Sequence, residues 1–233
     1  MNRFLRLFVI SSLCVALLGG CSLTDGSSGS LELPPSGSIA FVNASPSSAD
    51  VNIYFNEDKV NVEPFKFKDY FNYFTTAEGD KKFKITLVGS TVALSDTTIR
   101  VVQNKAYTVY VVDKPGTTTV KTLFLEDTGL LTDKANTMIR LIHLSPDTPA
   151  VNITLAGVAP SIGTGLTYQH ASNYVEFPTA SYTAEIRRVS DNALLLQVAL
   201  PALLPGSYQT MLFVGYTTPP VGNTNTLSAT VIR

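Results

Sequence analysis

The feature that most limits how this chain can fold is an internal repeat of about 100 residues. The segments Ile39–Pro46 and Ile139–Pro146 share Ile, Ser and Pro at identical offsets. In both copies the sequence Val-Asn-Ile follows, at 51–53 and at 151–153. Because this period is too long for a solenoid repeat or a propeller blade, each copy is expected to form a domain.

The similarity continues downstream with a slip of a single residue. The further matching positions are Asn72-Tyr73 with Asn173-Tyr174, Ile85 with Ile186, and Tyr107 with Tyr208. Gly129 and Asp133 interrupt the pattern between the copies. We therefore predict one domain over residues 37–130 and a second over residues 136–233.

Within each copy, apolar and polar residues alternate as in strands with one buried face. Phe83–Val88 and Tyr182–Arg187 show this most clearly. Residues 193–204 are rich in Ala and Leu, but Pro201 and Pro205 would break a helix there, so a buried strand and a loop are predicted. The sequence thus predicts an all-β chain with two tandem antiparallel β-sandwich domains, immunoglobulin-like or transthyretin-like.

The N-terminus has the pattern of an export signal. Arg3 and Arg6 precede an apolar run at 7–18, which is shorter than the ~20 residues that a membrane-spanning helix needs. The run ends in Leu-Gly-Gly20-Cys21, which resembles the lipobox of bacterial lipoproteins. That resemblance implies a signal peptide over 1–20, cleavage between Gly20 and Cys21, and acylation of Cys21, for example with palmitate. The alternative is an ordinary secretory signal that leaves an incidental thiol.

Acyl chains would anchor the mature chain to a membrane without spanning it. Residues 21–36 are rich in Ser, Gly and Pro and are predicted to be a flexible tether. Ser22 in place of Asp resembles the enterobacterial signal for the outer membrane. The expected location is therefore the cell envelope, with the outer membrane favoured, facing either the periplasm or the outside. Lys and Arg total 17 against 18 Asp and Glu, so no nucleic-acid partner is expected.

The segment Ile139–Ile153 resembles the signature of the domain-of-unknown-function family 4397, roughly Val-Arg-Val-Val-His-Ala-Ser-Pro-Asp-Ala-Pro-Ala-Val-Asp-Val. The resemblance extends over nearly all of residues 37–233 and implies an exported, all-β, often tandem and lipidated protein without an established activity. The first copy departs from the signature, because Asn43 replaces His and Ala49 replaces the second Pro.

The recurring signature residues are explained by a turn between two strands. Proline fixes φ at the turn, the serine hydroxyl can accept a backbone N–H bond, and the asparagine lies where the next strand begins. We expect a structural role for these residues, which are Ser45, Pro46, Asn52, Ser145, Pro146 and Asn152.

Catalytic and metal-binding patterns are weak in this sequence. The two histidines of the chain are His143 and His170. Because His143 stands two residues before Ser145, one hypothesis is a catalytic Ser–His contact, and the other is a histidine that is hydrogen-bonded at a turn. Asp50, Glu57 and Asp58 suggest either a calcium site or a solvated loop. No metal, no cofactor and no catalytic residue is expected.

Residues 65–74 form the most aromatic stretch of the chain. Tyr70, Phe71 and Tyr73 are candidates for a surface that contacts a protein or polysaccharide partner, although such rings also fill sandwich cores. The expected function is a non-catalytic envelope lipoprotein that serves as a binding or structural and adhesion module. The alternative is an envelope hydrolase with a site assembled from loops around His143 or His170.

Overall fold

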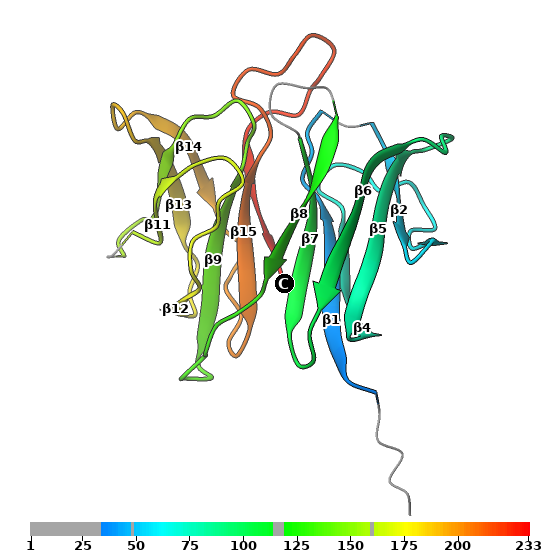
Figure 1. Cartoon of the computed structure of the whole chain (residues 1–233). Helices are drawn as coiled ribbons and strands as arrows, with labels where there is room; N and C mark the ends of the chain where they lie inside the picture. The colour runs from blue at the N-terminus through cyan, green and yellow to red at the C-terminus, as the bar shows by residue number, and fades with distance from the viewer. Residues whose placement is uncertain (1–33, 48, 114–118, 159–160) are drawn as a thin grey trace, which may run out of the picture. The chain divides into compact units, whose positions relative to one another are not determined.

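The computed structural model describes residues 34–47, 49–113, 119–158 and 161–233 (Figure 1). The predicted signal peptide, Cys21 and nearly all of the predicted tether lie outside these residues. Pro34–Arg233 form one compact unit, in which the described residues are organised into sixteen strands without a helix. The described residues therefore include no helix long and apolar enough to cross a membrane. The all-β prediction is confirmed.

The first copy of the repeat forms two four-stranded sheets with the strand orders β4-β1-β7-β8 and β3-β2-β5-β6. Its strands are β1 (Ser36–Asn43), β2 (Val51–Phe55), β3 (Asp58–Lys59), β4 (Tyr70–Ala77), β5 (Gly79–Leu87), β6 (Ala93–Val101), β7 (Ala106–Asp113) and β8 (Val120–Glu126).

The second copy repeats this topology strand for strand, with the sheet orders β12-β9-β15-β16 and β11-β10-β13-β14. Its strands are β9 (Asn136–Leu144), β10 (Val151–Leu155), β11 (Gly163–Leu166), β12 (Val175–Pro178), β13 (Thr183–Arg188), β14 (Leu194–Ala199), β15 (Tyr208–Val214) and β16 (Ser228–Ile232). Adding eight to each strand number of the first copy gives the second, so the sequence repeat is also a repeat of topology.

Most neighbouring strands are antiparallel, as predicted, but each copy contains one parallel pair. β1 pairs in parallel with β7, and β9 with β15. Parallel neighbours need a crossover connection. Between β1 and β7 the chain forms β2, β3, β5 and β6 of the other sheet and β4 at the edge of the same sheet. The crossover therefore consists of strands instead of a helix.

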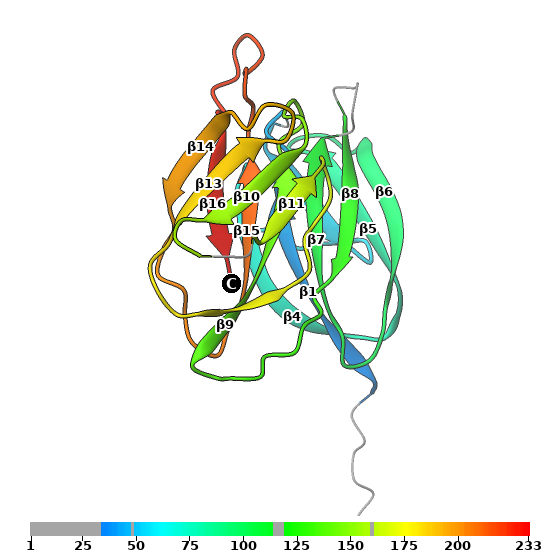
Figure 2. The same cartoon turned by 90° about the vertical axis from the view of Figure 1, so that its left-hand side faces the viewer.

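Each copy has an apolar core between its two sheets. Phe41, Ile53 and Phe83 belong to the first core, and Leu141, Ile153 and Phe213 to the second. Figure 2 shows the same strands from the side. These two sandwich-like pairs agree with the predicted architecture.

A third apolar cluster joins the two copies. It contains Val42 and Tyr110 from the first copy together with Ile142 and Leu212 from the second, all fully or almost fully buried. These residues lie on the sheets β4-β1-β7-β8 and β12-β9-β15-β16, which we call the inner sheets; their contact is the central interface. The central strands of the inner sheets are therefore buried on both faces, as the burial of β1 and β9 shows.

The segment at 193–204 folds as β14 followed by a loop, as predicted, but the strand is not buried. Its residues are either half-buried or exposed. The reason is its position at the edge of an outer sheet, where it pairs only with β13. The apolar composition of this segment correctly predicted a strand but wrongly predicted that the strand is buried.

Candidate functional site

The signature turns, meaning Ser45-Pro46 and Ser145-Pro146, are held by equivalent contacts in the two copies. The Ser45 N–H donates to Asn43 Oδ1 at 3.1 Å, and the Ser145 N–H donates to His143 Nδ1 at 3.3 Å. Asn43 and His143 thus perform the same structural task, which explains how one can replace the other in the signature.

The serine hydroxyls of these turns reach the ends of the strands paired in parallel. Ser45 Oγ donates to Asp113 Oδ1 at the end of β7, and Ser145 Oγ donates to the Gly215 carbonyl at 2.6 Å, just after β15. The signature asparagines hold neighbouring loops, since Asn152 Oδ1 accepts from the Gly165 N–H at 2.9 Å and Asn52 Oδ1 accepts from the Asn61 amide at 3.4 Å.

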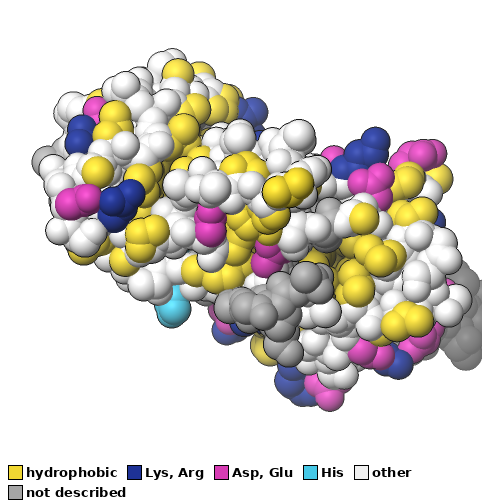
Figure 3. All heavy atoms as spheres, turned by 90° about the horizontal axis from the view of Figure 1, so that it is seen from above, with side chains coloured by type: hydrophobic (Ala, Val, Ile, Leu, Met, Phe, Trp, Pro, Cys, Tyr) yellow, Lys and Arg dark blue, Asp and Glu magenta, His cyan; other side chains and the backbone are white. Residues whose placement is uncertain are grey.

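Both signature turns, together with Asp147 directly after the second one, also hold the loop between β15 and β16. Asp147 accepts from the N–H groups of Thr217 and Thr218, each at 2.8 Å, while Asn223 Nδ2 donates to the Pro46 carbonyl at 2.7 Å. The loop presents a fully exposed Val221. It protrudes at one end of the sheets in Figure 1, and Figure 3 looks onto that end, where hydrophobic side chains lie among charged ones of both signs.

His143 is buried and both of its ring nitrogens are engaged. Nε2 lies 3.1 Å from the Pro149 carbonyl, and burial lowers the pKa of the imidazole. The Ser145 hydroxyl bonds to Thr148 Oγ1 at 2.6 Å and to the Gly215 carbonyl, so the structure forms no hydrogen bond between this hydroxyl and the imidazole. His170 is exposed, with Nδ1 at 2.8 Å from Thr167 Oγ1.

The acidic residues singled out for calcium do not converge among the described residues, which contain no His, Cys, Asp and Glu group suited to a metal ion. Glu57 instead lies 2.8 Å from Lys82 Nζ and 3.2 Å from Lys84 Nζ. These lysines lower the pKa of Glu57. The arrangement is a solvated ion-pair cluster on the outer sheet.

The three aromatic residues proposed as a partner surface face in two directions. The Phe71 ring packs 6.2 Å from the Phe41 ring on the sandwich side, while Tyr70 donates to the Arg233 carbonyl and Tyr73 to Asp127, on the side of the second copy. A β-bulge between β1 and β4 breaks the alternation of side chains between these positions.

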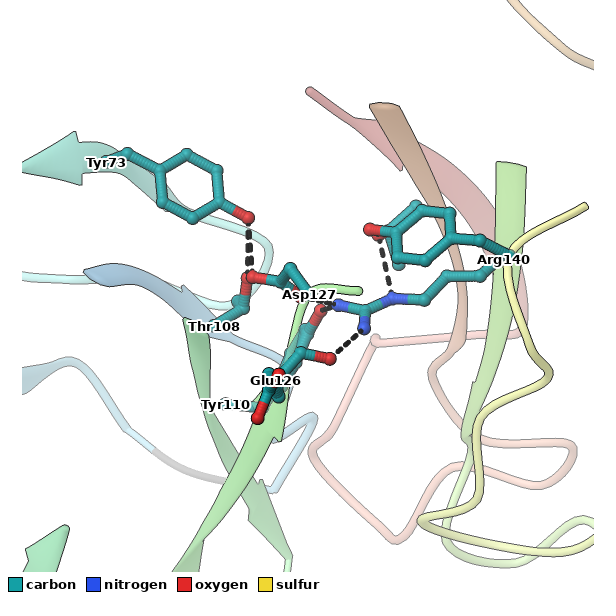
Figure 4. Close-up of polar contacts among 8 residues, drawn as sticks. Tyr73, Thr108, Tyr110, Glu126, Asp127 and Arg140 are labelled. Atoms are coloured by element: carbon teal, nitrogen blue, oxygen red, sulfur yellow. Dashed lines mark hydrogen bonds and ion pairs between the residues drawn. The ribbon is translucent and has the colours of Figure 1, made fainter. Parts of the chain in front are cut away.

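Asp127, directly after β8, is the centre of a buried polar network (Figure 4). Its Oδ2 accepts from Tyr73 OH at 2.6 Å and from Thr108 Oγ1 at 2.8 Å. Its Oδ1 pairs with Nη2 of Arg140, which lies on β9 of the second copy. Only 6% of the Asp127 side chain and 4% of the Arg140 side chain are exposed.

Arg140 is further held by groups from both copies. Nη2 donates to Tyr110 OH at 3.1 Å, Nη1 to the Glu126 carbonyl at 3.3 Å and Nε to Thr210 Oγ1 at 3.1 Å. Burial acts to lower the pKa of Arg140, but Tyr110 and Asp127 together raise it, so the guanidinium stays charged.

The network is built on a duplicated Tyr–Thr contact. Tyr73 OH lies 3.1 Å from Thr108 Oγ1, and Tyr174 OH lies 3.1 Å from Thr210 Oγ1. The two threonines correspond in the strand register, because Thr108 pairs with Ala40 and Thr210 with Arg140, although the sequence match of Tyr107 with Tyr208 would align Thr108 with Gln209. The ion pair has no such duplicate, because Ala40 stands where the second copy has Arg140. Sequence reasoning missed this pair, although an arginine inside an otherwise apolar run was an available signal.

A pocket of about 540 Å³ adjoins the network and is called the interface pocket below. Tyr73, Tyr174 and Tyr208 contribute aromatic surface, and the Lys105–Glu126 ion pair, at 2.8 Å, contributes charge. The remaining lining residues are Ser38, Asn104, Ala106, Asp127, Thr128 and Gly129. Neither histidine is among these described lining residues.

Two contacts fix the aromatic wall of this pocket. The rings of Tyr174 and Tyr208 lie edge to face with centroids 5.7 Å apart, and Tyr208 OH accepts from the Leu131 N–H at 3.2 Å. A Cβ atom at Gly129 would lie 3.2 Å from both tyrosines, so a larger residue there would require its neighbours to shift by a few tenths of an ångström. A second pocket of about 470 Å³ lies on the Arg140 side.

No curated protein shows significant sequence similarity to this chain. The sequence profile of the domain of unknown function DUF4397 matches residues 37–154, just over half of the chain. This match covers all strands of the first copy and ends within β10, so it is shorter than the resemblance that the sequence suggested. The chain belongs to the DUF4397 family.

Proposed function

We propose that this protein is a non-catalytic binding module of the cell envelope, anchored through a lipid on Cys21. The observation that carries the binding role is the interface pocket. Ligand sites typically occupy about 300–1,000 Å³, combine aromatic walls with a few polar groups, and often lie where two structural units meet. The interface pocket has all three properties.

The pocket is also pre-organised, which favours binding because little side-chain motion remains to be lost. Tyr73 and Tyr174 are held through their hydroxyls by Asp127 and Thr210. Glu176 holds the linker beside the pocket by accepting from Thr132 and Asp133, and hydrogen bonds from Thr132 and Asn136 lower the pKa of Glu176 to about 2. The ligand therefore meets a site that is already formed.

The lipid anchor rests on the Leu-Gly-Gly-Cys21 pattern. In this proposal the acyl chains hold the protein on the membrane, with the outer membrane favoured, while the chain from 21 to 36 connects the anchor to β1. The partner is a soluble or polymeric ligand of the envelope, either a protein or a polysaccharide.

Metabolic labelling with an alkyne-bearing fatty acid tests the anchor. The wild-type chain should be labelled and remain in the membrane fraction, whereas Cys21→Ser should be unlabelled and released or retained as precursor. A labelled Cys21→Ser chain, or an unlabelled wild type, would contradict the proposal. Hydrolysis of an ester, peptide or glycoside by the purified chain, reduced in His170→Gln, would replace the binding role with the hydrolase hypothesis.

A further inference from the structure

We infer that the interface pocket binds a neutral carbohydrate, with the pyranose ring seated against Tyr208 and Tyr73. The inference rests on the proposed binding function and specifies its ligand class. Tyr208 begins β15 and Tyr73 lies on β4, so one aromatic surface comes from each copy of the repeat. The two side chains line the same pocket.

These tyrosines are partly exposed, while their hydroxyls are already engaged in hydrogen bonds within the protein. Tyr73 is 40% exposed and Tyr208 41% exposed, yet both hydroxyls are bonded within the protein. What remains for a ligand is ring surface, whose negative quadrupole attracts polarised C–H groups. A pyranose presents C–H groups on its faces and hydroxyls around its edge. The rings therefore fit the faces of a sugar.

The polar lining fits the hydroxyl edge of the same ligand. The Asn104 amide both donates and accepts, the Ser38 hydroxyl does the same, and Glu126 accepts. Asn104 adopts a positive φ of 60°, a conformation that asparagine tolerates better than most residues. A ligand with many hydroxyls uses mixed donors and acceptors of this kind.

The charges at the pocket favour a neutral ligand over an ionic one. Lys105 lies 2.8 Å from Glu126, and Asp127 pairs with the buried Arg140. Each charged side chain among the described lining residues thus faces an opposite charge within the protein. An anionic ligand would have to compete with Glu126 for Lys105, and a cationic one would have to compete with Lys105 for Glu126.

A proline-rich or aromatic peptide is the main competing ligand for a tyrosine-lined pocket. The two classes differ in what they need, because a peptide presents few hydroxyls and gains little from Asn104 and Glu126. We therefore commit to carbohydrate and include the peptide as an outcome of the test.

The experiment uses the full mature chain in detergent and saturation-transfer NMR, followed by titration calorimetry. The probes are neutral oligomers of glucose, galactose, mannose and N-acetylglucosamine, an oligogalacturonate, and a proline-rich peptide. We expect saturation transfer to the C–H protons of at least one neutral oligomer. Its affinity should change less than about twofold between low and high salt, because no ligand charge is screened.

Variants of Tyr208 separate ring stacking from structure. Tyr208→Ala should weaken binding about tenfold or more, as for an aromatic residue at the centre of a site, whereas Tyr208→Phe keeps the ring and should stay within about threefold. Tyr54→Ala, on β2 of the outer sheet, is the matched control and should bind normally. Equal losses in Tyr208→Phe and Tyr208→Ala would mean that the hydroxyl and not the ring face matters, which overturns the stacking geometry.

Binding of the galacturonate or the peptide, with no transfer to any neutral oligomer, would overturn the carbohydrate inference and leave the binding function standing. Absence of binding by all probes would also overturn the inference. The anchor is tested independently by fatty-acid labelling at Cys21, so failure of the ligand class and failure of the envelope assignment give different results.

Discussion

The buried ion pair of Arg140 and Asp127 links the two copies at the central interface. Two charges removed from water are tolerated only when they pair well and their remaining hydrogen-bonding groups are satisfied. Here Tyr73, Thr108 and Tyr110 supply these additional bonds. Removing one charge leaves the other buried without compensation.

We therefore predict that Asp127→Asn lowers the free energy of unfolding by about 3–5 kcal/mol. Denaturant titration followed by circular dichroism measures the change. The matched control is Asp80→Asn, which breaks the Asp80–Arg100 pair, whose side chains are 66% and 69% exposed. That change should cost less than about 1 kcal/mol. Equal effects of the two substitutions would show that the buried pair contributes no more than a surface pair.

His143 makes stability depend on pH in a defined direction. Its pKa is lowered from the ordinary 6.5 by burial, so near this pH the folded chain binds fewer protons than the unfolded chain. The contribution of His143 to the free energy of unfolding is therefore fully present above pH 6.5. This contribution declines as the pH falls toward the pKa of His143 in the folded state.

The first copy of the repeat suggests the informative variant. His143→Asn should preserve the acceptor for the Ser145 N–H, as Asn43 does for Ser45, and should remove this part of the acid sensitivity. His143→Leu should cost about 1–3 kcal/mol at neutral pH, because it leaves a buried N–H without a partner. Urea unfolding at pH 7.5 and pH 5 compares the three proteins. Unchanged acid sensitivity in His143→Asn would assign the effect to another group.

At the scale of elements, the signature turns do more than reverse the chain. Each turn connects the end of a central strand to its parallel neighbour, and together they hold the β15–β16 loop from both copies. Ser145 and Asp147 of the signature are therefore used in hydrogen bonds to the end of β15 and to the β15–β16 loop.

Asp147→Ala should release one end of that loop. The amides of Thr217 and Thr218 lose their acceptor, so we expect their hydrogen exchange to accelerate at least tenfold while the amides of β9 and β15 stay protected. Exchange measured by NMR or mass spectrometry checks this. Faster exchange across β15 as well would mean that the turn supports the strand and not only the loop.

Local patterns predicted most of the elements and little of their long-range pairing. Alternation in Phe83–Val88 and Tyr182–Arg187 corresponds to β5 and β13, because each strand has one face on a core. The parallel pairs were not predicted, since pairing between β1 and β7 depends on contacts distant in sequence. The apolar runs of β1 and β9 contained the missed signal: strands buried on both faces lose alternation.

The candidate site was predictable only in fragments. Tyr73 was singled out for its aromatic surroundings and does line the interface pocket, but Phe71 and Tyr73 point in different directions because of a bulge. Asp127 lies near the end of the domain predicted over residues 37–130, and its partner Arg140 stands in a strand where the first copy has Ala40. A pocket between two copies requires knowledge of how the copies pack, which no local pattern encodes.

At the scale of the whole unit, each copy buries an apolar face of its inner sheet against the other copy, and not against its own residues. Val42, Tyr110 and Val112 of the first copy are buried by residues of the second. The sequence prediction of two domains at 37–130 and 136–233 stays a prediction about independent folding. The third cluster indicates that such domains would expose an apolar sheet face.

We expect residues 37–130, expressed alone, to self-associate or to bind a hydrophobic dye, whereas the full mature chain in detergent should unfold in a single cooperative transition. Light scattering and dye fluorescence test the first expectation, and calorimetry the second. A monomeric, dye-free first copy, together with two separate transitions of the full chain, would show that the central interface contributes little.

The unmatched Arg140 also makes the two copies unequal. A chain composed of two first copies would present Ala40 to the carboxylate of Asp127 and would leave that buried charge without its arginine. The first copy therefore cannot replace the second in the central interface, although the two share one topology.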